Sequence, residues 1–229
     1  MKKIIITARD PSTGFDLIKI INLLLEENNF SIFLIAEEPA HHIITRNINL
    51  TNYDKHINSI LLKDYNLEKK REEIEKFINS FKPDLILTGV SGPDYGVDEI
   101  CLEIAHKLRY EKTFSLQSYW GDVNNKLNKQ ANNLFVLDKY AKQITKERLP
   151  NSKIFITGNQ QSSKWSNHNW FKSKQDFQCK FNIPNDRKII TFFSQPLSKY
   201  DFYWETINDF LKIISTEYKD DYLFIKKHP

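Results

Sequence analysis

The sequence predicts an α/β protein: a doubly wound parallel sheet, followed by the first strand, helix and strand of a second sheet. Two observations predict this class. Short, continuous apolar runs alternate with longer amphipathic segments, as expected when helices cover both faces of parallel strands. The alternation then stops at a polar stretch and begins again near residue 186. This restart indicates two successive layers of strand and helix.

Seven apolar runs predict the strands of the first sheet. Each run is rich in Ile, Leu, Phe or Val and is continuous rather than alternating, which is typical of strands buried on both faces. In chain order they are Ile4–Ala8, Ser31–Ala36, Ser59–Leu62, Leu85–Val90, Thr113–Gln117, Leu134–Leu137 and Ile154–Thr157. Strands that alternate with helices predict right-handed crossovers and a parallel sheet.

Three helices between these strands have a clear apolar face. The first is predicted over Phe15–Glu27, directly after a turn, and places Asp16 in its first turn, where the helix dipole favours an acid. The second is predicted over residues 67–81, with a charged outer face that we interpret as solvated. The third is predicted over residues 97–108 and carries Cys101 on its apolar face, so we expect a buried thiol.

The chain divides into three parts by composition. We expect a Rossmann-like N-terminal domain over residues 1–160, an interdomain linker with a short helix over 161–185, and the start of a second Rossmann-like domain over 186–229. The elements expected in the last part are a strand at Lys188–Ser194, a helix at Asp201–Tyr218 and a strand at Tyr222–Lys226. Two strands leave long unpaired edges and one uncovered face, so we do not expect this segment to fold alone. The remaining strands could come from elsewhere, the fragment could dock on the first domain, or the sequence could be incomplete, which is the interpretation we favour.

Composition and charge exclude several classes of protein. The chain has 229 residues with 33 basic and 29 acidic side chains, and this net charge of +4 is too weak to indicate nucleic acid as the main partner. Cys101 and Cys179 fit no metal or redox spacing, which suggests a reducing compartment. No apolar run approaches the ~20 residues that span a bilayer. We therefore expect a soluble, cytoplasmic protein without a metal centre.

Loops that follow parallel strands line the crevice where open α/β sheets bind ligands. The loop that ends at Gly14 leads into a helix N-terminus that could hold an anion, but it matches neither dinucleotide nor P-loop fingerprints. The loop over residues 89–96 holds three glycines, which permit close approach of a ligand to the backbone. We take Gly14, Ser91 and Gly92 as candidate binding residues and Asp94 as a candidate base, with purely structural turns as the alternative.

The loop after the fifth strand combines rings with an acid. Tyr119 and Trp120 could stack on the apolar face of a sugar, although core packing would explain Trp120 equally well. Asp122 follows them, and an acid in such a cleft can act as a general base if its pKa lies near the working pH. Asp122 is the first candidate for that role, and Asp94 and Asp16 are its rivals.

Three further polar segments follow strands, at Thr157–Gln160, Ser194–Pro196 and Lys226–Pro229. Their order and spacing resemble the GT-B glycosyltransferase superfamily, which includes capsule-type, sialyl- and glycerophosphate-transferring enzymes and the similar sugar-nucleotide 2-epimerases. In that superfamily a Thr-Gly-Asn segment closes the first domain, a strand ending in Ser-Gln-Pro opens the second, and a later strand ends in Lys-x-His-Pro. The match stops there, because the next helix and the later acidic and Ser/Thr positions that grip the nucleotide have no counterpart.

The resemblance implies two facing Rossmann-like domains, with the nucleotide donor held mostly by the second. It implies that His228 contacts the donor phosphate, and it makes Asn159, Ser194, Gln195 and Lys227 candidate substrate-binding residues. The implied activity is transfer of a sugar from a nucleotide sugar to a carbohydrate acceptor during synthesis of a surface polysaccharide. The nucleotide sugar would be a substrate, with no cofactor and no required metal. A position peripheral to a membrane, a separate C-terminal-half subunit and a homodimer are all compatible with this function.

Two other functions remain open at this point. The chain could be a non-catalytic acceptor-binding subunit, or a remnant, of a split glycosyltransferase whose catalytic half is a separate polypeptide. It could also be an isomerase like the sugar-nucleotide 2-epimerases, which use the same fold on a free nucleotide sugar.

Overall fold

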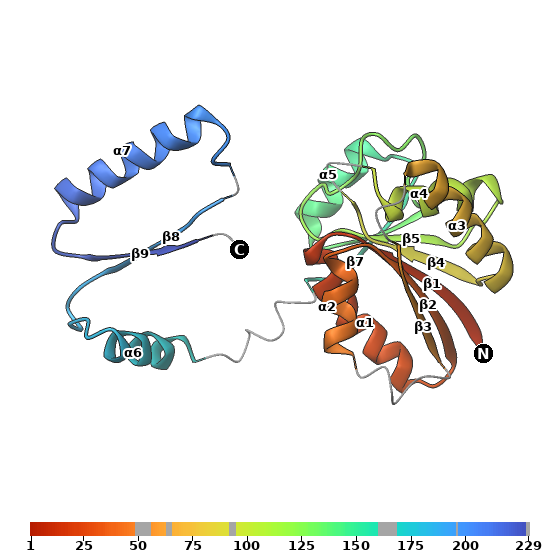
Figure 1. The fold of residues 1–229 in the computed structure, drawn as a ribbon, viewed down its shortest axis with the longest axis horizontal. Coiled ribbons are helices and arrows are strands. Elements are labelled where there is room, and N and C mark those ends of the chain that lie inside the picture. The colour runs from red at the N-terminus through yellow and green to blue at the C-terminus, as the bar shows by residue number, and fades with distance from the viewer. Residues whose placement is uncertain (49–55, 63–65, 92–94, 160–168, 196, 228–229) are drawn as a thin grey trace. The chain divides into compact units, whose positions relative to one another are not determined.

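The computed structural model describes residues 1–48, 56–62, 66–91, 95–159, 169–195 and 197–227. The chain forms two compact units, Met1–Ser166 (unit 1) and Asn167–Pro229 (unit 2). Both units are α/β in character, as Figure 1 shows.

Unit 1 is built on a seven-stranded parallel sheet in the order β3-β2-β1-β4-β5-β6-β7. Its strands are β1 (Lys2–Ala8), β2 (Phe30–Ala36), β3 (Ile57–Leu61), β4 (Leu85–Thr88), β5 (Thr113–Leu116), β6 (Asn133–Val136) and β7 (Lys153–Ile156). All seven expected strands are confirmed. The strand order reverses between β1 and β4, and ligands of open α/β sheets bind beyond the carboxyl ends of the strands at such a reversal.

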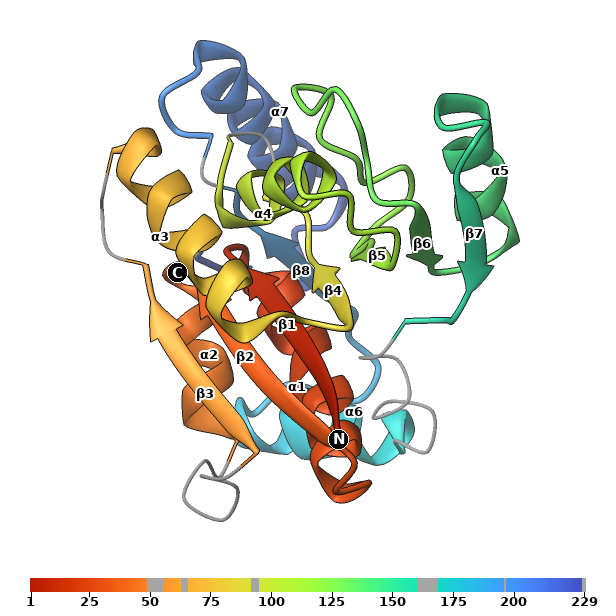
Figure 2. The ribbon, with the colours of Figure 1, turned by 90° about the vertical axis from the view of Figure 1, so that its right-hand side faces the viewer.

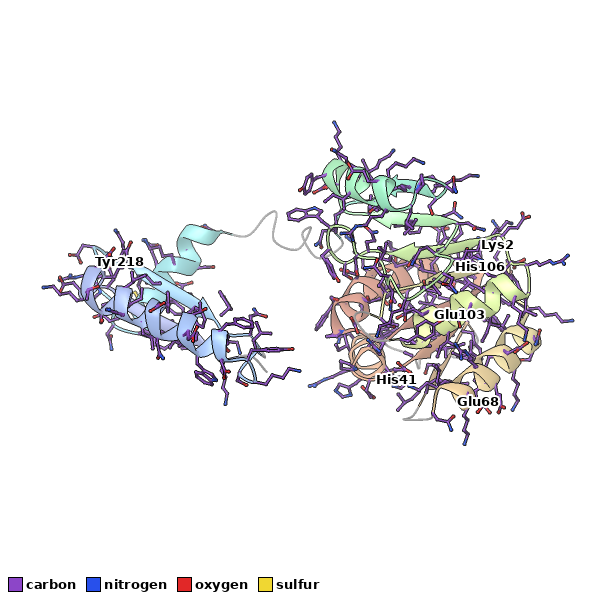
Figure 3. All side chains as sticks on the ribbon, turned by 90° about the horizontal axis from the view of Figure 1, so that it is seen from above. Lys2, His41, Glu68, Glu103, His106 and Tyr218 are labelled. Atoms are coloured by element: carbon purple, nitrogen blue, oxygen red, sulfur yellow. The ribbon has the colours of Figure 1, made fainter. Side chains whose placement is uncertain are left out.

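Five helices pack on this sheet: α1 (Pro11–Glu26), α2 (Ala40–Asn47), α3 (Leu67–Phe81), α4 (Val97–Lys107) and α5 (Lys139–Arg148). Helices α1 and α2 cover one face, and α3 and α4 cover the other (Figures 1 and 2). Arg71 on α3 joins Glu103 on α4 across 2.9 Å, and Figure 3 labels Glu103 on α4 and Glu68 at the start of α3. The doubly wound arrangement expected from the sequence is therefore present.

Strand β1 shows why its sequence is continuously apolar. Ile4 and Ile6 lie in the core cluster that contains Leu17 of α1, whereas Ile5 lies in the cluster that contains Ile74 of α3. Successive strand residues point to opposite faces, and here both faces are covered by helices. Each of these isoleucines is almost completely buried, and burial of such a side chain contributes roughly 1.5–3 kcal/mol.

The first helix begins earlier than expected. It starts at Pro11 rather than at Phe15, because proline at the first helical position has its φ already set and has no N–H to leave unpaired. The Gly14 N–H donates to the Asp10 carbonyl over 3.0 Å, which places Gly14 in the first turn. The expectation that Asp16 lies in the first turn is therefore wrong. Helices α2 and α5 also have no counterpart among the helices expected from periodicity.

Three phenylalanines form a row across the last strands of the sheet. The Phe114 ring of β5 lies 5.4 Å from that of Phe135 on β6, which lies 6.1 Å from that of Phe155 on β7. Phe114 and Phe135 pack at the margin of the core cluster that α1 covers, whereas Phe155 is exposed. The apolar side chains on this face of the sheet are therefore more exposed to solvent towards β7.

Unit 2 contains the β-α-β order that the sequence predicts. Its elements are α6 (Trp170–Lys180), β8 (Ile189–Phe193), α7 (Asp201–Glu217) and β9 (Tyr222–Lys226), and the two strands are parallel neighbours. Phe192 of β8 packs on Phe210 of α7. Phe224 of β9 points to the other face of the sheet and packs on Phe177 of α6. Helix α6, which falls within the range expected to be a linker, thus covers one face of this small sheet.

Candidate functional site

Ser118, two positions beyond β5, brings two of the predicted acids together. Its hydroxyl donates a hydrogen bond of 3.1 Å to Oδ2 of Asp16 on α1. Its backbone N–H donates to Oδ2 of Asp122, also over 3.1 Å. Both carboxylates therefore lie at the carboxyl ends of β1 and β5, on the side of the sheet where the strand order favours a ligand site. The third candidate base, Asp94, lies outside the described residues, as does Gly92.

Asp122 is buried, and its surroundings favour the protonated carboxyl. Burial raises its pKa from the ordinary 3.8 to about 6, and the negative charges of Asp10 and Asp98 act in the same direction. Hydrogen bonds from the Ser118 N–H and the Tyr119 hydroxyl oppose this shift. A carboxylate with a pKa near 6 is ionised at neutral pH and is still basic enough to accept a proton in a reaction.

A second buried acid organises the loop after β4. Asp98, in the first turn of α4, is completely buried and accepts hydrogen bonds from the Thr7 hydroxyl (2.6 Å) and the Gly89 N–H (2.9 Å) at Oδ1. The Ser91 hydroxyl donates to its other oxygen. Burial raises the pKa of Asp98, and the three donors oppose the rise. This carboxylate therefore ties the end of β1 to the loop that follows β4.

Glu99 holds the same loop through its backbone. Its two carboxylate oxygens accept hydrogen bonds from the N–H of Ser91 (3.0 Å) and of Gly96 (2.9 Å). Burial, and then the charge of Asp98, raise the pKa of Glu99 from 4.5 to about 7. The hydroxyl and the N–H of Ser91 are thus both bonded to buried carboxylates.

Neither Asp98 nor Glu99 is among the site residues predicted from the sequence. The available signal was a pair of acids directly after a glycine-containing loop and at the start of a helix, where carboxylates commonly cap the backbone.

Glycines allow α1 to lie close to its neighbours. A Cβ atom built on Gly89 would lie 2.3 Å from Cγ2 of Thr13, which is far inside van der Waals contact. A Cβ on Gly14 would lie 3.2 Å from Cα of Ala40. Gly89 therefore permits the close approach of α1 to the end of β4, and Gly14 permits the packing of α1 on α2.

Exposed rings lie beside Asp122. Trp120 is 57% exposed, so it is not part of the core, and its indole N–H donates to Oδ2 of Asp138 over 2.9 Å. The other oxygen of Asp138 accepts from the Ala141 N–H and caps α5. Tyr140 on α5 lies 5.8 Å from Trp120, with the two rings nearly perpendicular. We call Trp120 and Tyr140 the aromatic platform. The similarly exposed Tyr119 directly precedes Trp120 in the sequence, and its hydroxyl hydrogen-bonds Asp122.

The remaining predicted residues follow other strands. In unit 1, Asn159 is exposed beyond the end of β7. In unit 2, Ser194 follows β8, and its N–H donates to the carbonyl of Lys226 over 3.0 Å. The exposed side chains of Gln195 and Lys227 therefore follow the carboxyl ends of two neighbouring strands. His228 lies outside the described residues.

No group of three or more His, Cys, Asp or Glu side chains in the described ranges is arranged to hold a metal ion. In the same part of the chain, no helix has the length and apolar character needed to cross a membrane.

No family model matches the sequence, and no curated protein matches it. Solved structures do match along the whole chain. MnaA of S. aureus, solved with UDP, has 17% identity and a TM-score of 0.68, and the match covers 100% of this chain and 62% of MnaA. The UDP-GlcNAc 2-epimerase of Neisseria meningitidis, bound to UDP-GlcNAc, has 16% identity and a TM-score of 0.63, with 100% and 66% covered.

The glycotransferase of kitacinnamycin has 9% identity and a TM-score of 0.52, and the match covers 98% of this chain and 65% of that enzyme. The fold is GT-B-like. This result confirms the fold implied by the sequence motifs. The chain spans 62–66% of the length of these three structures.

Proposed function

We propose that this chain binds a nucleotide sugar and transfers the sugar to a hydroxyl group of a carbohydrate acceptor, in the synthesis of a surface polysaccharide. The single observation that carries the proposal is the placement of Asp122, a buried acid with a pKa of about 6, two positions after the exposed ring of Trp120 at the carboxyl edge of the sheet. The GT-B-like fold supports it, since one matched structure contains UDP and another contains UDP-GlcNAc.

The acceptor would be held and activated by unit 1. Aromatic faces stack on the apolar face of a sugar ring, and the aromatic platform offers two such rings. Asp122 would take the proton from the acceptor hydroxyl, and Asp16 would hold Ser118, whose N–H bonds the base. The acceptor oxygen then forms a bond to the anomeric carbon as the bond from that carbon to the diphosphate breaks.

The donor would be held largely by unit 2. Ser194, Gln195 and Lys227 follow the two strand ends, and with His228 they would offset the charge that develops on the leaving diphosphate. The nucleotide sugar is consumed as a substrate in this scheme, and no step requires a metal. We place the protein in the cytoplasm, a location that its two free thiols, Cys101 and Cys179, support.

The test uses the whole chain with UDP-GlcNAc as the donor probe, in the presence and absence of a carbohydrate acceptor, followed by NMR of the sugar products. Transfer predicts UDP release only when the acceptor is present. Asp122→Asn should then reduce the rate by roughly 10²–10⁴-fold. Asp176→Asn makes the same chemical change on an exposed residue of α6 and should leave the rate unchanged. Equal turnover in both variants would remove Asp122 from the mechanism.

The matched UDP-GlcNAc 2-epimerase of Neisseria meningitidis favours a second candidate, isomerisation of the nucleotide sugar itself. The same experiment separates the two activities, because isomerisation yields a 2-epimer with no acceptor and no UDP release. Binding of the acceptor without any change in the donor would instead support a non-catalytic acceptor-binding subunit.

A further inference from the structure

A cavity of about 900 Å³ opens at the edge of unit 1 where β5, β6 and β7 begin. This is the opposite edge of the parallel sheet from Asp122, which follows the end of β5. Figure 3 labels two residues at this edge, Lys2 at the start of β1 and His106 near the end of α4. His106 also reaches the cavity wall, because its Nε2 lies 3.0 Å from the carbonyl oxygen of Gln130.

The cavity wall is strongly cationic. Lys112, Lys129, Arg148 and Lys153 line it, with Glu111 as the single acid of the lining. Residues 126–153 contain seven basic and two acidic side chains, a net charge of +5, whereas the whole chain carries +4. The excess positive charge of the protein is thus concentrated in the segment that forms most of this cavity.

The three lysines are available to a ligand. Each is exposed, and none has an ion-pair partner within the ranges that the structure describes. Lys112 precedes β5 and Lys153 is the first residue of β7, so the sheet itself fixes the backbone positions of both. A lysine ammonium group is a point charge that pairs readily with phosphate or carboxylate oxygens.

The same wall offers groups that suit a sugar. The side-chain amides of Asn132 and Asn133 donate to the carbonyls of Glu111 (2.8 Å) and Thr113 (3.0 Å). Each bond uses one N–H of the amide and fixes the amide in place, and the amide oxygen can accept a hydrogen bond from a hydroxyl. Phe114 adds an aromatic ring to the lining.

We propose that this cavity binds an anionic sugar, that is, a saccharide that carries a phosphate or a carboxylate group. The lysines recognise the anion, the asparagine oxygens recognise hydroxyls, and Phe114 contacts the ring. The volume lies within the ~300–1,000 Å³ of typical small-molecule sites. The site is separate from Asp122 and does not depend on the proposed transfer reaction.

Isothermal titration of the whole chain tests the proposal with four probes: glucose 1-phosphate, glucuronate, glucose and inorganic phosphate. We expect saturable, salt-sensitive binding of at least one anionic sugar, tighter than that of glucose or inorganic phosphate. The variant Lys112→Gln/Lys153→Gln should weaken this binding by roughly tenfold or more, since it removes two charged partners. The variant Lys76→Gln/Lys212→Gln changes the net charge equally on exposed residues of α3 and α7 and should bind like the wild type.

Three results would overturn the proposal. They are no saturable binding of either anionic sugar, equal affinity for inorganic phosphate, and equal weakening in the two double variants. A titration with UDP-GlcNAc, repeated in the presence of a saturating anionic sugar, shows whether the two ligands compete. Unchanged affinity for UDP-GlcNAc would mean that the cavity and the proposed donor site are distinct. If the wild type binds the anionic sugar but not UDP-GlcNAc, this result would contradict the proposed function and would still support the assignment of the cavity.

Discussion

Ser118 and Asp16 are 102 positions apart in the sequence, yet the serine hydroxyl donates a hydrogen bond of 3.1 Å to the aspartate carboxylate. This contact joins the loop after β5 to the second turn of α1. Because the N–H of the same serine bonds Asp122, one residue positions both acids at the carboxyl edge of the sheet.

Ser118→Ala removes the bond to Asp16 and keeps the backbone bond to Asp122. Loss of a hydrogen bond to a buried charged group should lower the free energy of unfolding by about 1–3 kcal/mol, measured by urea denaturation. Ser80→Ala is the matched control, because the Ser80 hydroxyl makes an exposed bond to the Phe77 carbonyl of its own helix, and the change should stay within roughly 0.5 kcal/mol. Equal effects of the two substitutions would contradict a linking role for Ser118.

The pH dependence of the proposed transfer reaction should report Asp122. A base must be ionised, so kcat/KM should rise with pH through about 6, the pKa of Asp122, and level off above it. Asp122→Asn should abolish this rise of kcat/KM near pH 6, together with most of the rate. If the residual activity of that variant still rises with pH through about 6, another group is responsible for the pH dependence.

Glu99 should make the folded state less stable as the pH rises. Its pKa is about 7 in the folded protein against an ordinary 4.5, so between these values the folded state holds a proton that the unfolded state has released. Stability therefore falls across this window, by an amount on the order of 3 kcal/mol at most. Melting temperatures of Glu99→Gln between pH 5 and 8 should fall less steeply than those of the wild type.

Glu72→Gln is the control for this measurement, because Glu72 is exposed on α3. It should keep the pH dependence of the wild type. If both variants follow the wild-type curve, Glu99 is not the titrating group.

Gly89→Ala should destabilise the fold by roughly 1–3 kcal/mol, as expected for overpacking, because its Cβ would collide with Thr13. Thr13 is buried and its branched side chain has little rotamer freedom to move aside. Adding Thr13→Ala removes the colliding atoms and should restore part of the loss, as a double-mutant cycle of thermal unfolding would show. Additive losses would mean that the two residues do not interfere.

Trp120→Ala should weaken acceptor binding with little effect on stability, because the ring is largely exposed. A stacked ring contributes about 0.5–1.5 kcal/mol, so the acceptor KM should rise by roughly two- to tenfold. Trp120→Phe keeps a ring but loses the bond to Asp138, so its acceptor KM should lie between that of the wild type and that of Trp120→Ala. An unchanged acceptor KM in Trp120→Ala would exclude the aromatic platform from acceptor binding.

The strands were predictable because of how they are buried. Residues such as Ile4 and Ile5 face two different helical layers, and that requirement leaves a continuous apolar run in the sequence. Helices α2 and α5 have no comparable apolar pattern in the sequence, because each buries only two residues. These are Ala40 and Ile44 in α2, and Ala141 and Thr145 in α5.

The site was predictable only in part. Asp122 was found because it follows a strand end, and its neighbour Asp16 because it lies near the start of a helix. The role of Asp98 depends on Thr7, which is 91 positions away. Such a contact exists only once β1 and β4 pair, and no local pattern in the sequence records it. The start of α1 was missed because the segment from Pro11 to Gly14 has the composition of a turn.

Helix α7 contains no buried residue, whereas β1 is buried from Ile4 to its end at Ala8. Local opening requires less free energy where fewer apolar contacts must break. In native-state hydrogen–deuterium exchange, the α7 amides should therefore lose their protection at low denaturant, long before those of β1. The chain would then behave as two cooperative folding units of very different lifetime, with the proposed base in the long-lived one.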